Sequence, residues 1–490
     1  FTVVVNAGTS LSDNSSDLLG YGGPIRDTGV PNVFNVFDLD NAKKRATQEG
    51  SEEMTQSIFA SAEIGWKSML YLTLTGRNDW ASQLKGSNPT SFFYPSVGLS
   101  AVISEMVTLP KAIDYLKVRG SFSSVGTPYP RFLVQPTYSY DPTKQDWNAK
   151  THYPIGKLKP ERTDSWEIGV DGTFFKDFKV SGSFYYANTY NQTFDPKITV
   201  SSGYSTLYVQ TGYVRNLGVE GLLSYGHTWR DFGWNSNFTF SWNKNKIVEL
   251  VKDYVHPETG EIVNKDRLEL KGLGYTKFIL KEGGALGDLY TNADFIRDDK
   301  GYIQIDKNGD VAKTDNLPDI KLGSVFPKAN LAWNNSFSYK GIYAGFQLSA
   351  RLGGIVYSAT QAALDQYGVS EASAAARDRG GVLVNGRSWV NAQQYYEIVA
   401  TSSGLPQYYT YSATNLRLQE AHIGYTIPRK WLGNICDINV SVVGRNLWMI
   451  YCKAPFDPEA IATTNNFYQG IDYFMMPSTR NFGFNVKINF

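Results

Sequence analysis

Aromatic side chains that could bind a ligand are concentrated in one stretch of the sequence, residues 353–414. The densest group there is Trp389, Tyr395, Tyr396, Tyr408, Tyr409 and Tyr411, and Trp147 lies in a separate segment. Aromatic faces stack on sugar rings, and Tyr and Trp also anchor protein interfaces. These residue types therefore favour contact with a substrate. Packing inside a loop and contact with a partner protein are the alternatives.

Residue patterns that carry catalysis are absent from the sequence. It contains no Gly-x-Ser-x-Gly elbow, no His-Glu-x-x-His pair and no phosphate-binding glycine loop. Carboxylate pairs such as Glu52-Glu53 and Asp298-Asp299 fall in predicted loops without a plausible pocket, and the four histidines are widely scattered. We therefore expect no enzymatic activity, no cofactor and no metal site.

One short segment, Asp306-Lys307-Asn308-Gly309-Asp310, could be taken for a calcium loop. Its glycine does not fall at the EF-hand position, and no Glu follows at the required distance. A tight Asn-Gly turn is the simpler prediction.

The composition excludes some classes of function and favours a β-rich fold. The 490 residues carry a net charge of +1, which gives no electrostatic basis for nucleic-acid binding. Aromatic residues make up 14% and there are 45 glycines, a mixture suited to pleated strands joined by turns. No apolar run reaches the roughly 20 residues that a transmembrane helix needs.

Alternation of apolar and polar residues is the main structural signal. At the C-terminus Phe482, Phe484 and Val486 alternate with polar residues, which predicts a strand with one apolar face. The same pattern predicts strands at 1–8, 57–65, 69–77, 92–103, 115–123, 162–174, 178–188, 212–228, 234–246, 329–339, 341–352, 415–426, 437–449 and 480–490. Most have ~9–13 residues, enough to cross a bilayer when tilted. Cys436 and Cys452 fall near opposite ends of one strand, roughly 50 Å apart, so we expect no disulfide between them unless the following loop folds back.

The predicted connections alternate strictly in length. Short ones are 66–68, 104–114, 175–177, 229–233, about 340, and 427–436. Long ones are 9–56, 78–91, 124–161, 189–211, 247–328, 353–414 and 450–479, of which 353–414 includes an Ala-rich part, Gln361 to Asp378, that could form a short helix. Outer-membrane barrels have short periplasmic turns and long extracellular loops, so the pattern predicts a transmembrane antiparallel β-barrel. A soluble all-β protein is the alternative, and a solenoid would show a fixed period.

The polar face of these strands should line the lumen of the barrel. Its charged members include Arg77, Lys117, Arg119, Glu167, Asp171, Glu220, Arg351, Arg445 and Lys487. In a wide barrel such groups stay hydrated and can face a plug or a substrate. The alternative is that they only solvate the wall and pair with one another.

Several motifs together resemble one known family. They are Gly76-Arg77-Asn78-Asp79-Trp80, Ser91-Phe92-Phe93-Tyr94-Pro95-Ser96-Val97-Gly98, Leu116-Lys117-Val118-Arg119-Gly120-Ser121, Leu158-Lys159-Pro160-Glu161-Arg162-Thr163, Trp166-Glu167-Ile168-Gly169, Asn216-Leu217-Gly218-Val219-Glu220-Gly221, Asn243-Lys244-Asn245-Lys246-Ile247, Gly444-Arg445-Asn446-Leu447 and Asp457-Pro458-Glu459. Taken together and in this order, the motifs resemble those of the SusC/RagA family of TonB-dependent outer-membrane transporters from Bacteroidota. The resemblance covers the sequence from about residue 57 to its end.

The resemblance implies a larger assembly than this sequence holds. The family's barrel has about 22 strands and is preceded by a plug and a segment that contacts the TonB complex. We therefore expect residues 1–490 to be the C-terminal part of a barrel, with the plug and early strands absent from this chain. The resemblance also implies a SusD-like surface lipoprotein as a lid, and a terminal Phe490 that resembles the assembly signal of outer-membrane barrels.

The expected function is TonB-dependent import of a large nutrient, a glycan or an oligopeptide, across the bacterial outer membrane. The alternatives are a receptor of the siderophore or vitamin type without a lid, a passive porin or structural barrel, and a soluble glycan-binding protein or glycosidase. The family motifs argue against the siderophore type, and the sequence does not choose between glycan and peptide.

Overall fold

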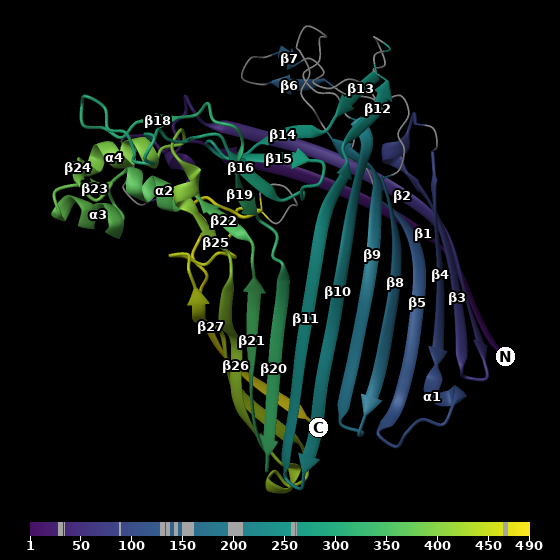
Figure 1. Ribbon diagram of the computed structural model, residues 1–490. Coiled ribbons are helices and arrows are strands. Elements are labelled where there is room, and N and C mark those ends of the chain that lie inside the picture. Colours follow the sequence, from purple (N-terminus) through teal and green to yellow (C-terminus); the bar gives the residue numbers. More distant parts are fainter. Residues whose placement is uncertain are drawn as a thin grey trace.

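The computed structural model describes residues 1–27, 33, 35–87, 90–127, 133, 138–141, 146–148, 161–194, 209–255, 260, 262–463 and 469–490. Within these residues, fourteen strands pair in sequence order into one antiparallel sheet that curves into an open shell (Figure 1). They are β1 (Thr2–Gly22), β2 (Arg45–Trp66), β3 (Leu70–Ala81), β4 (Phe92–Val102), β5 (Ile113–Thr127), β8 (Glu161–Phe174), β9 (Phe178–Phe194), β10 (Val209–Trp229), β11 (Phe232–Glu249), β20 (Ala329–Tyr339), β21 (Ile342–Leu352), β26 (Asn415–Ile427), β27 (Asp437–Cys452) and β29 (Asn481–Asn489).

All fourteen predicted strands are present, and the sorting of their connections is confirmed. Short turns such as 67–69, 175–177 and 340–341 lie at one end of the sheet, and the long loops lie at the other. Cys436 and Cys452 are both free thiols, as expected. None of the helices among the described residues is long and apolar enough to span a bilayer.

The prediction was too short for β1 and β2, which were expected at 1–8 and 57–65. Their outer halves are rich in Ser, Asp, Glu and Gly and lack apolar alternation. The two halves nevertheless pair with each other without a break, from Thr2 opposite Gly65 to Gly22 opposite Arg45. Backbone hydrogen bonding, and not a buried face, therefore extends this hairpin beyond the predicted ends.

Strand register assigns every residue of the sheet to one of two faces. Cross-strand partners lie on the same face. One row of partners is polar or small throughout: Ser100, Arg119, Gly169, Ser183, Glu220, Ser241, Asn330 and Arg351. The neighbouring row, shifted by one residue, is largely apolar: Leu72, Leu99, Gly120, Ile168, Phe184, Val219 and Trp242. The sheet therefore has one polar and one apolar face.

The two edges of the sheet, β1 and β29, do not pair with each other within the described residues. An unpaired strand edge leaves backbone N–H and C=O groups without partners, and in a bilayer each such group is costly. The edges of β1 and β29 are therefore available for pairing with further strands.

The long loops contain most of the remaining secondary structure. The strands are β6 (Ser139–Asp141), β7 (Asp146–Asn148), β12 (Val251–Val255), β13 (Ile262–Lys265), β14 (Arg267–Lys271), β15 (Lys277–Lys281), β16 (Asp288–Thr291), β17 (Asp294–Phe295), β18 (Lys313–Thr314), β19 (Ile320–Ser324), β22 (Ile355–Ser358), β23 (Val382–Val384), β24 (Ser388–Val390), β25 (Thr410–Ser412) and β28 (Ile471–Asp472). The helices are α1 (Ile103–Met106), in a short turn, and α2 (Ala359–Gln366), α3 (Glu371–Asp378) and α4 (Ala392–Val399), in the loops. Short 3-10 turns lie at Val36–Asp38, Ser82–Leu84, Pro406–Tyr409 and Arg429–Trp431.

The short helix expected between Gln361 and Asp378 is present as two helices, α2 and α3. Each begins at a serine whose hydroxyl accepts a backbone N–H three residues on, Ser358 from Gln361 and Ser370 from Ser373, both at 3.0 Å. Such caps satisfy N–H groups that the first helical turn leaves free.

The face assignment yields a prediction about lipid exposure. Phe346 lies on the apolar face, edge-on to Trp333 at 5.7 Å between ring centroids, and Gln347 lies on the polar face opposite Asn334. Arg at a lipid-facing midplane position costs about 2–4 kcal/mol, whereas lumen positions tolerate charge. We expect Phe346→Arg to lower the free energy of unfolding in lipid vesicles by that amount and Gln347→Arg to change it little. Equal losses would contradict the face assignment.

Candidate functional site

At the end of the sheet that carries the long connections, three loops fold together. We call this unit the loop body and define it as residues 267–328, 353–414 and 469–472. It contains the four-stranded sheet β14-β15-β16-β19 and the three-stranded sheet β25-β22-β28, which joins two loops that are distant in sequence (Figure 1). Its core includes Phe278, Leu289, Phe295, Val325, Tyr357, Val399, Leu405, Tyr409 and Ile471. The loops are therefore packed structures with their own apolar core.

This packing corrects part of the expected substrate surface. Tyr409 is only 4% exposed, and its hydroxyl donates to Asp365 at 3.0 Å. Burial, followed by the Asp365 carboxylate, raises the pKa of Tyr409. Tyr395 and Tyr396 pack against the same core, and burial raises the pKa of Tyr395 to about 12. Tyr409 is thus a core residue and not a ligand contact, because the sequence shows an aromatic type but not the side it faces.

Other members of the aromatic group do reach the surface. Trp389 is 57% exposed and stands opposite Leu383, which is also exposed, in the β23–β24 hairpin. Tyr408 is 41% exposed, and its hydroxyl accepts a hydrogen bond from Arg297 at 3.2 Å. Tyr411 is half-buried, edge-on to Phe456 at 5.6 Å between ring centroids.

Trp147, the candidate outside this stretch, lies in another loop. It is 63% exposed and packs edge-on against Tyr140 at 5.3 Å between ring centroids. Of the seven aromatic residues predicted as substrate contacts, Trp389, Tyr408 and Trp147 are therefore the exposed ones, which are fewer than the sequence suggested.

The predicted lumen residues lie on the polar face. Strand register places Arg77, Arg119, Glu167, Asp171, Glu220, Arg351 and Arg445 on that face together. Arg119 bridges Glu167 and Asp171, with N–O distances of 3.0 Å to each. Its guanidinium lies across Gly169, where a Cβ would come within 2.7 Å of it. Arg119 and Glu220 also line a shallow hollow of about 400 Å³.

Three of the other charged residues on this face have close partners. Arg77 pairs with Asp79 at 2.6 Å, Arg445 pairs with Glu420 at 2.9 Å, and Arg351 donates to the carbonyl of Val325 at 2.9 Å. The polar face therefore contains both mutual ion pairs and groups, such as Glu220, that open onto a hollow.

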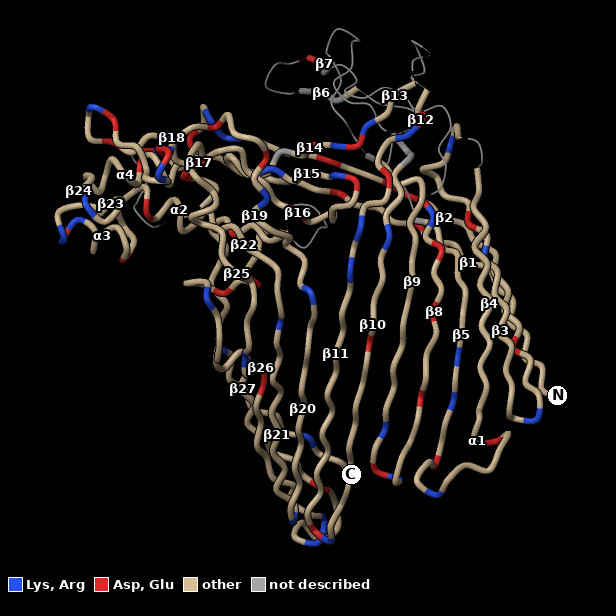
Figure 2. The backbone as a smooth tube through the Cα atoms, viewed as in Figure 1, with Lys and Arg blue, Asp and Glu red and all other residues tan. Residues whose placement is uncertain are grey.

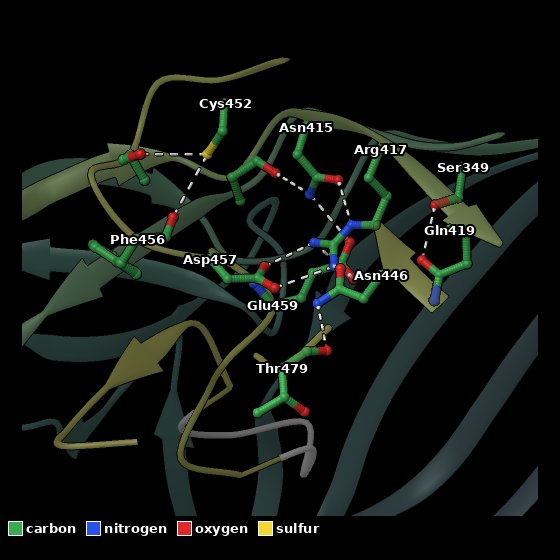
Figure 3. A network of polar contacts seen from close by, with 12 residues as sticks. Ser349, Asn415, Arg417, Gln419, Asn446, Cys452, Phe456, Asp457, Glu459 and Thr479 are labelled. Atoms are coloured by element: carbon green, nitrogen blue, oxygen red, sulfur yellow. Dashed lines mark hydrogen bonds and ion pairs between the residues drawn. The ribbon is translucent and has the colours of Figure 1, made fainter. Parts of the chain in front are cut away.

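The sequence analysis did not single out Arg417, which holds the last long loop to the sheet. Arg417 is 5% exposed and donates two hydrogen bonds to Asp457, at 2.7 and 3.1 Å (Figure 3). Glu459 lies 3.4 Å from the same guanidinium and accepts a hydrogen bond from Asn415 at 3.1 Å. The Asp457-Pro458-Glu459 motif could have indicated such a residue in the sequence. Two carboxylates in a loop that packs against the sheet need a cation as partner.

The electrostatics of Asp457 reflect this pairing. Burial alone would raise the pKa of its carboxyl group, but the hydrogen bonds from Arg417 and from the Glu459 backbone outweigh burial, so the pKa is lowered. Asp457 therefore remains charged in the folded protein.

Two further motifs lie on β10 and β11, and Asn245 of the second one contacts the loop body. Asn245 donates its amide to Asn216 at 2.9 Å, and its oxygen accepts the backbone N–H of Leu286 at 2.9 Å. Tyr185, on β9, lies directly over Gly218, and its hydroxyl donates to Asn243 at 3.2 Å. These contacts give the asparagines and the glycine of both motifs a structural role.

The two glycines of the Asn216–Gly221 motif make a matched test of that role. A methyl group at Gly218 would collide with the ring of Tyr185, whereas nothing lies within 4 Å of a Cβ at Gly221. We expect Gly218→Ala to lower the free energy of unfolding by about 1 kcal/mol, because the Tyr185 ring has to move and loses its hydrogen bond to Asn243. Gly221→Ala should change it little. Denaturant unfolding in detergent measures both, and similar effects would contradict this reasoning.

The segment 306–310 forms a tight turn, which confirms the prediction of an Asn-Gly turn there. The Asp306 carboxylate accepts the backbone N–H groups of Asn308 and Asp310 at 2.8 and 3.0 Å, and Gly309 has φ +86°. Across the described residues, no group of three or more His, Cys, Asp or Glu side chains could hold a metal ion.

Comparisons with known proteins agree with this architecture. The family described as TonB dependent receptor-like, beta-barrel, matches residues 3–447. TonB-dependent receptor P3 of Formosa agariphila is 24% identical over 470 residues, 88% of this chain and 45% of that protein. The TonB-dependent receptor SusC of Bacteroides thetaiotaomicron is 22% identical over 433 residues, 80% of this chain and 40% of that protein. The solved RagAB peptide importer in its closed-closed state superimposes with a TM-score of 0.73 at 17% identity, over 100% of this chain and 53% of that one.

A curved antiparallel sheet with short turns at one end and folded loops at the other defines an outer-membrane β-barrel protein. The chain belongs to the TonB-dependent receptor-like β-barrel family. It spans about half the length of the curated relatives that it matches.

Proposed function

We propose that this chain supplies part of the wall and the extracellular loops of a TonB-dependent importer for a large nutrient, a glycan or an oligopeptide. The observation that carries the proposal is the loop body. Loops that only connect strands need no apolar core, and long ordered loops on a rigid scaffold usually bind something. Its exposed Trp389 and Leu383 suit contact with a carbohydrate or with a protein surface.

A SusD-like surface lipoprotein is the proposed partner at the loop body, and the TonB complex is the proposed energy source. Further strands and a plug would complete the barrel, since β1 and β29 are open edges among the described residues. The polar face would then confine the route of the nutrient, with the Arg119 cluster and Glu220 facing the plug or the cargo.

The test compares growth on polymeric nutrients of two strains. One strain lacks the gene for this protein, and the other lacks TonB. Growth on one class, glycans or peptides, should be lost in both strains, while growth on its monomers is retained. Purification of the complete protein under mild detergent should recover a surface lipoprotein. Unchanged growth on every polymer, with a defect only under iron or vitamin limitation, would instead favour a siderophore or vitamin receptor.

A further inference from the structure

Basic side chains gather on the apolar face of the sheet, at the ends of β10 and β11 next to the long loops. They are Arg215, Lys244 and Lys246, which we call the outward basic cluster. Arg215 pairs in register with Lys246, and Lys244 with Leu217. Figure 2 shows blue at the upper ends of both strands. These residues therefore lie on the face opposite Glu220 and point away from the proposed lumen.

The position of this cluster along the strand corresponds to the edge of a bilayer. On the outward face of β11, Trp234 and Trp242 are eight residues apart, roughly 26 Å at about 3.3 Å per residue. Strands of outer-membrane barrels are tilted by about 40°, so this length spans about 20 Å of height, within the apolar band of about 25 Å that aromatic girdles delimit. Lys244 and Lys246 occupy the next two outward positions beyond Trp242. They therefore lie at the level of the lipid headgroups on the extracellular side.

Arg215 is held in place on this surface by its neighbours. Its Nε donates to Asn188 at 3.3 Å and its Nη2 donates to the hydroxyl of Tyr213 at 2.6 Å. Its guanidinium also lies over the ring of Tyr186, 5.1 Å from the centroid. Asn188 is only 9% exposed, so the guanidinium is anchored against a rigid part of the wall. Anchoring a cation in advance lowers the ordering cost of binding an anion.

Nearby carboxylates do not neutralise the cluster. Asp164 belongs to the same cross-strand row but is paired with Arg162 at 2.8 Å. Glu249 lies opposite Tyr213 and is paired with Lys252 at 3.9 Å. Neither Lys244 nor Lys246 forms an ion pair with any residue that the structure describes. The surface thus has an excess of positive charge beside an aromatic girdle.

We propose that the outward basic cluster binds the phosphate-bearing headgroup of an anionic lipid in the extracellular leaflet of the outer membrane. Arg and Lys provide charge-assisted hydrogen bonds to phosphate oxygens, and basic sites at headgroup depth bind anionic lipids. The cluster faces away from the polar face, so this site is separate from the path of the imported nutrient.

Native mass spectrometry of the complete outer-membrane protein, titrated with bisphosphorylated lipid A or with dephosphorylated lipid A, tests the proposal. The wild-type protein should bind the phosphorylated lipid more tightly. The triple variant Arg215→Gln/Lys244→Gln/Lys246→Gln should weaken that binding about tenfold or more. As a matched control, Lys67→Gln/Lys176→Gln/Lys340→Gln removes three charges from the turns at the opposite end and should leave it unchanged.

Three results would overturn the proposal. One is equal binding of the two lipids by the wild-type protein, which requires no variant to fold. Another is unaltered lipid A binding by the triple variant when its barrel is shown to be folded by heat-modifiable mobility. The third is full displacement of the lipid by excess inorganic phosphate, which would indicate a site for free phosphate and not for a lipid headgroup.

Discussion

Replacing Arg417 with Met should lower the free energy of unfolding by about 3–5 kcal/mol, because two carboxylates would lose their buried cation. Arg417 is 5% exposed and joins β26 to the loop that carries Asp457 and Glu459. Removing one partner of a buried ion pair leaves the other charge without compensation. The measurement is denaturant unfolding of the complete protein in detergent, with protease sensitivity of residues 453–480 as a local readout.

Arg445→Met is the matched control on the neighbouring strand. Arg445 also pairs with a carboxylate, Glu420 at 2.9 Å, but its side chain is mostly exposed. Pairs of this kind contribute about 0–1 kcal/mol, so this variant should lose far less stability. A loss for Arg417→Met no greater than that for Arg445→Met would contradict the assigned role.

Acid offers an independent check on the same pair. The pKa of Asp457 is lowered in the folded protein, so its contribution is present above the unfolded pKa of about 3.9 and is lost as pH falls through the folded value. The stability difference between wild type and Arg417→Met should therefore shrink in strong acid. A difference that stays constant down to that pH range would exclude Asp457 as the source.

Excising residues 353–414 should abolish growth on the cognate nutrient while the barrel still assembles. Arg351 and Asn415 are cross-strand partners, so a short Gly-Ser linker can connect β21 to β26. The deletion removes β22, the three loop helices and about half of the core of the loop body, so the remaining loops lose their packing partners. Growth assays combined with heat-modifiable mobility of the outer-membrane protein separate loss of function from loss of assembly.

A smaller change distinguishes the surface of the loop body from its core. The double variant Leu383→Ser/Trp389→Ala alters only the exposed faces of the β23–β24 hairpin. If this hairpin contacts the nutrient or the lid, the double variant should reduce growth while the loop body remains protease-resistant.

Full growth of the strain that lacks residues 353–414, with the shortened protein present in the outer membrane, would show that these residues contact neither the nutrient nor the lid.

Most of the sheet could be predicted from the sequence because its signal is local. A strand that faces lipid on one side and water on the other alternates with period two, and that pattern placed all fourteen strands and put Arg119, Glu220 and Arg351 on one face. The role of Phe490, which is 84% exposed after β29, as an assembly signal stays a prediction. The long paired ends of β1 and β2 escaped prediction because polar hairpins lack that periodicity.

The candidate site depended on contacts between residues far apart in the chain. The sequence by itself determined that residues 353–414 are aromatic and lie between two strands, at the end of the barrel with long loops. Only the tertiary structure decided that Tyr409 is buried against Asp365 whereas Trp389 is exposed, because burial depends on which other loop packs there. The same holds for Arg417, whose carboxylate partners lie 40 and 42 residues further along the chain and meet it only when the last loop folds back onto the sheet.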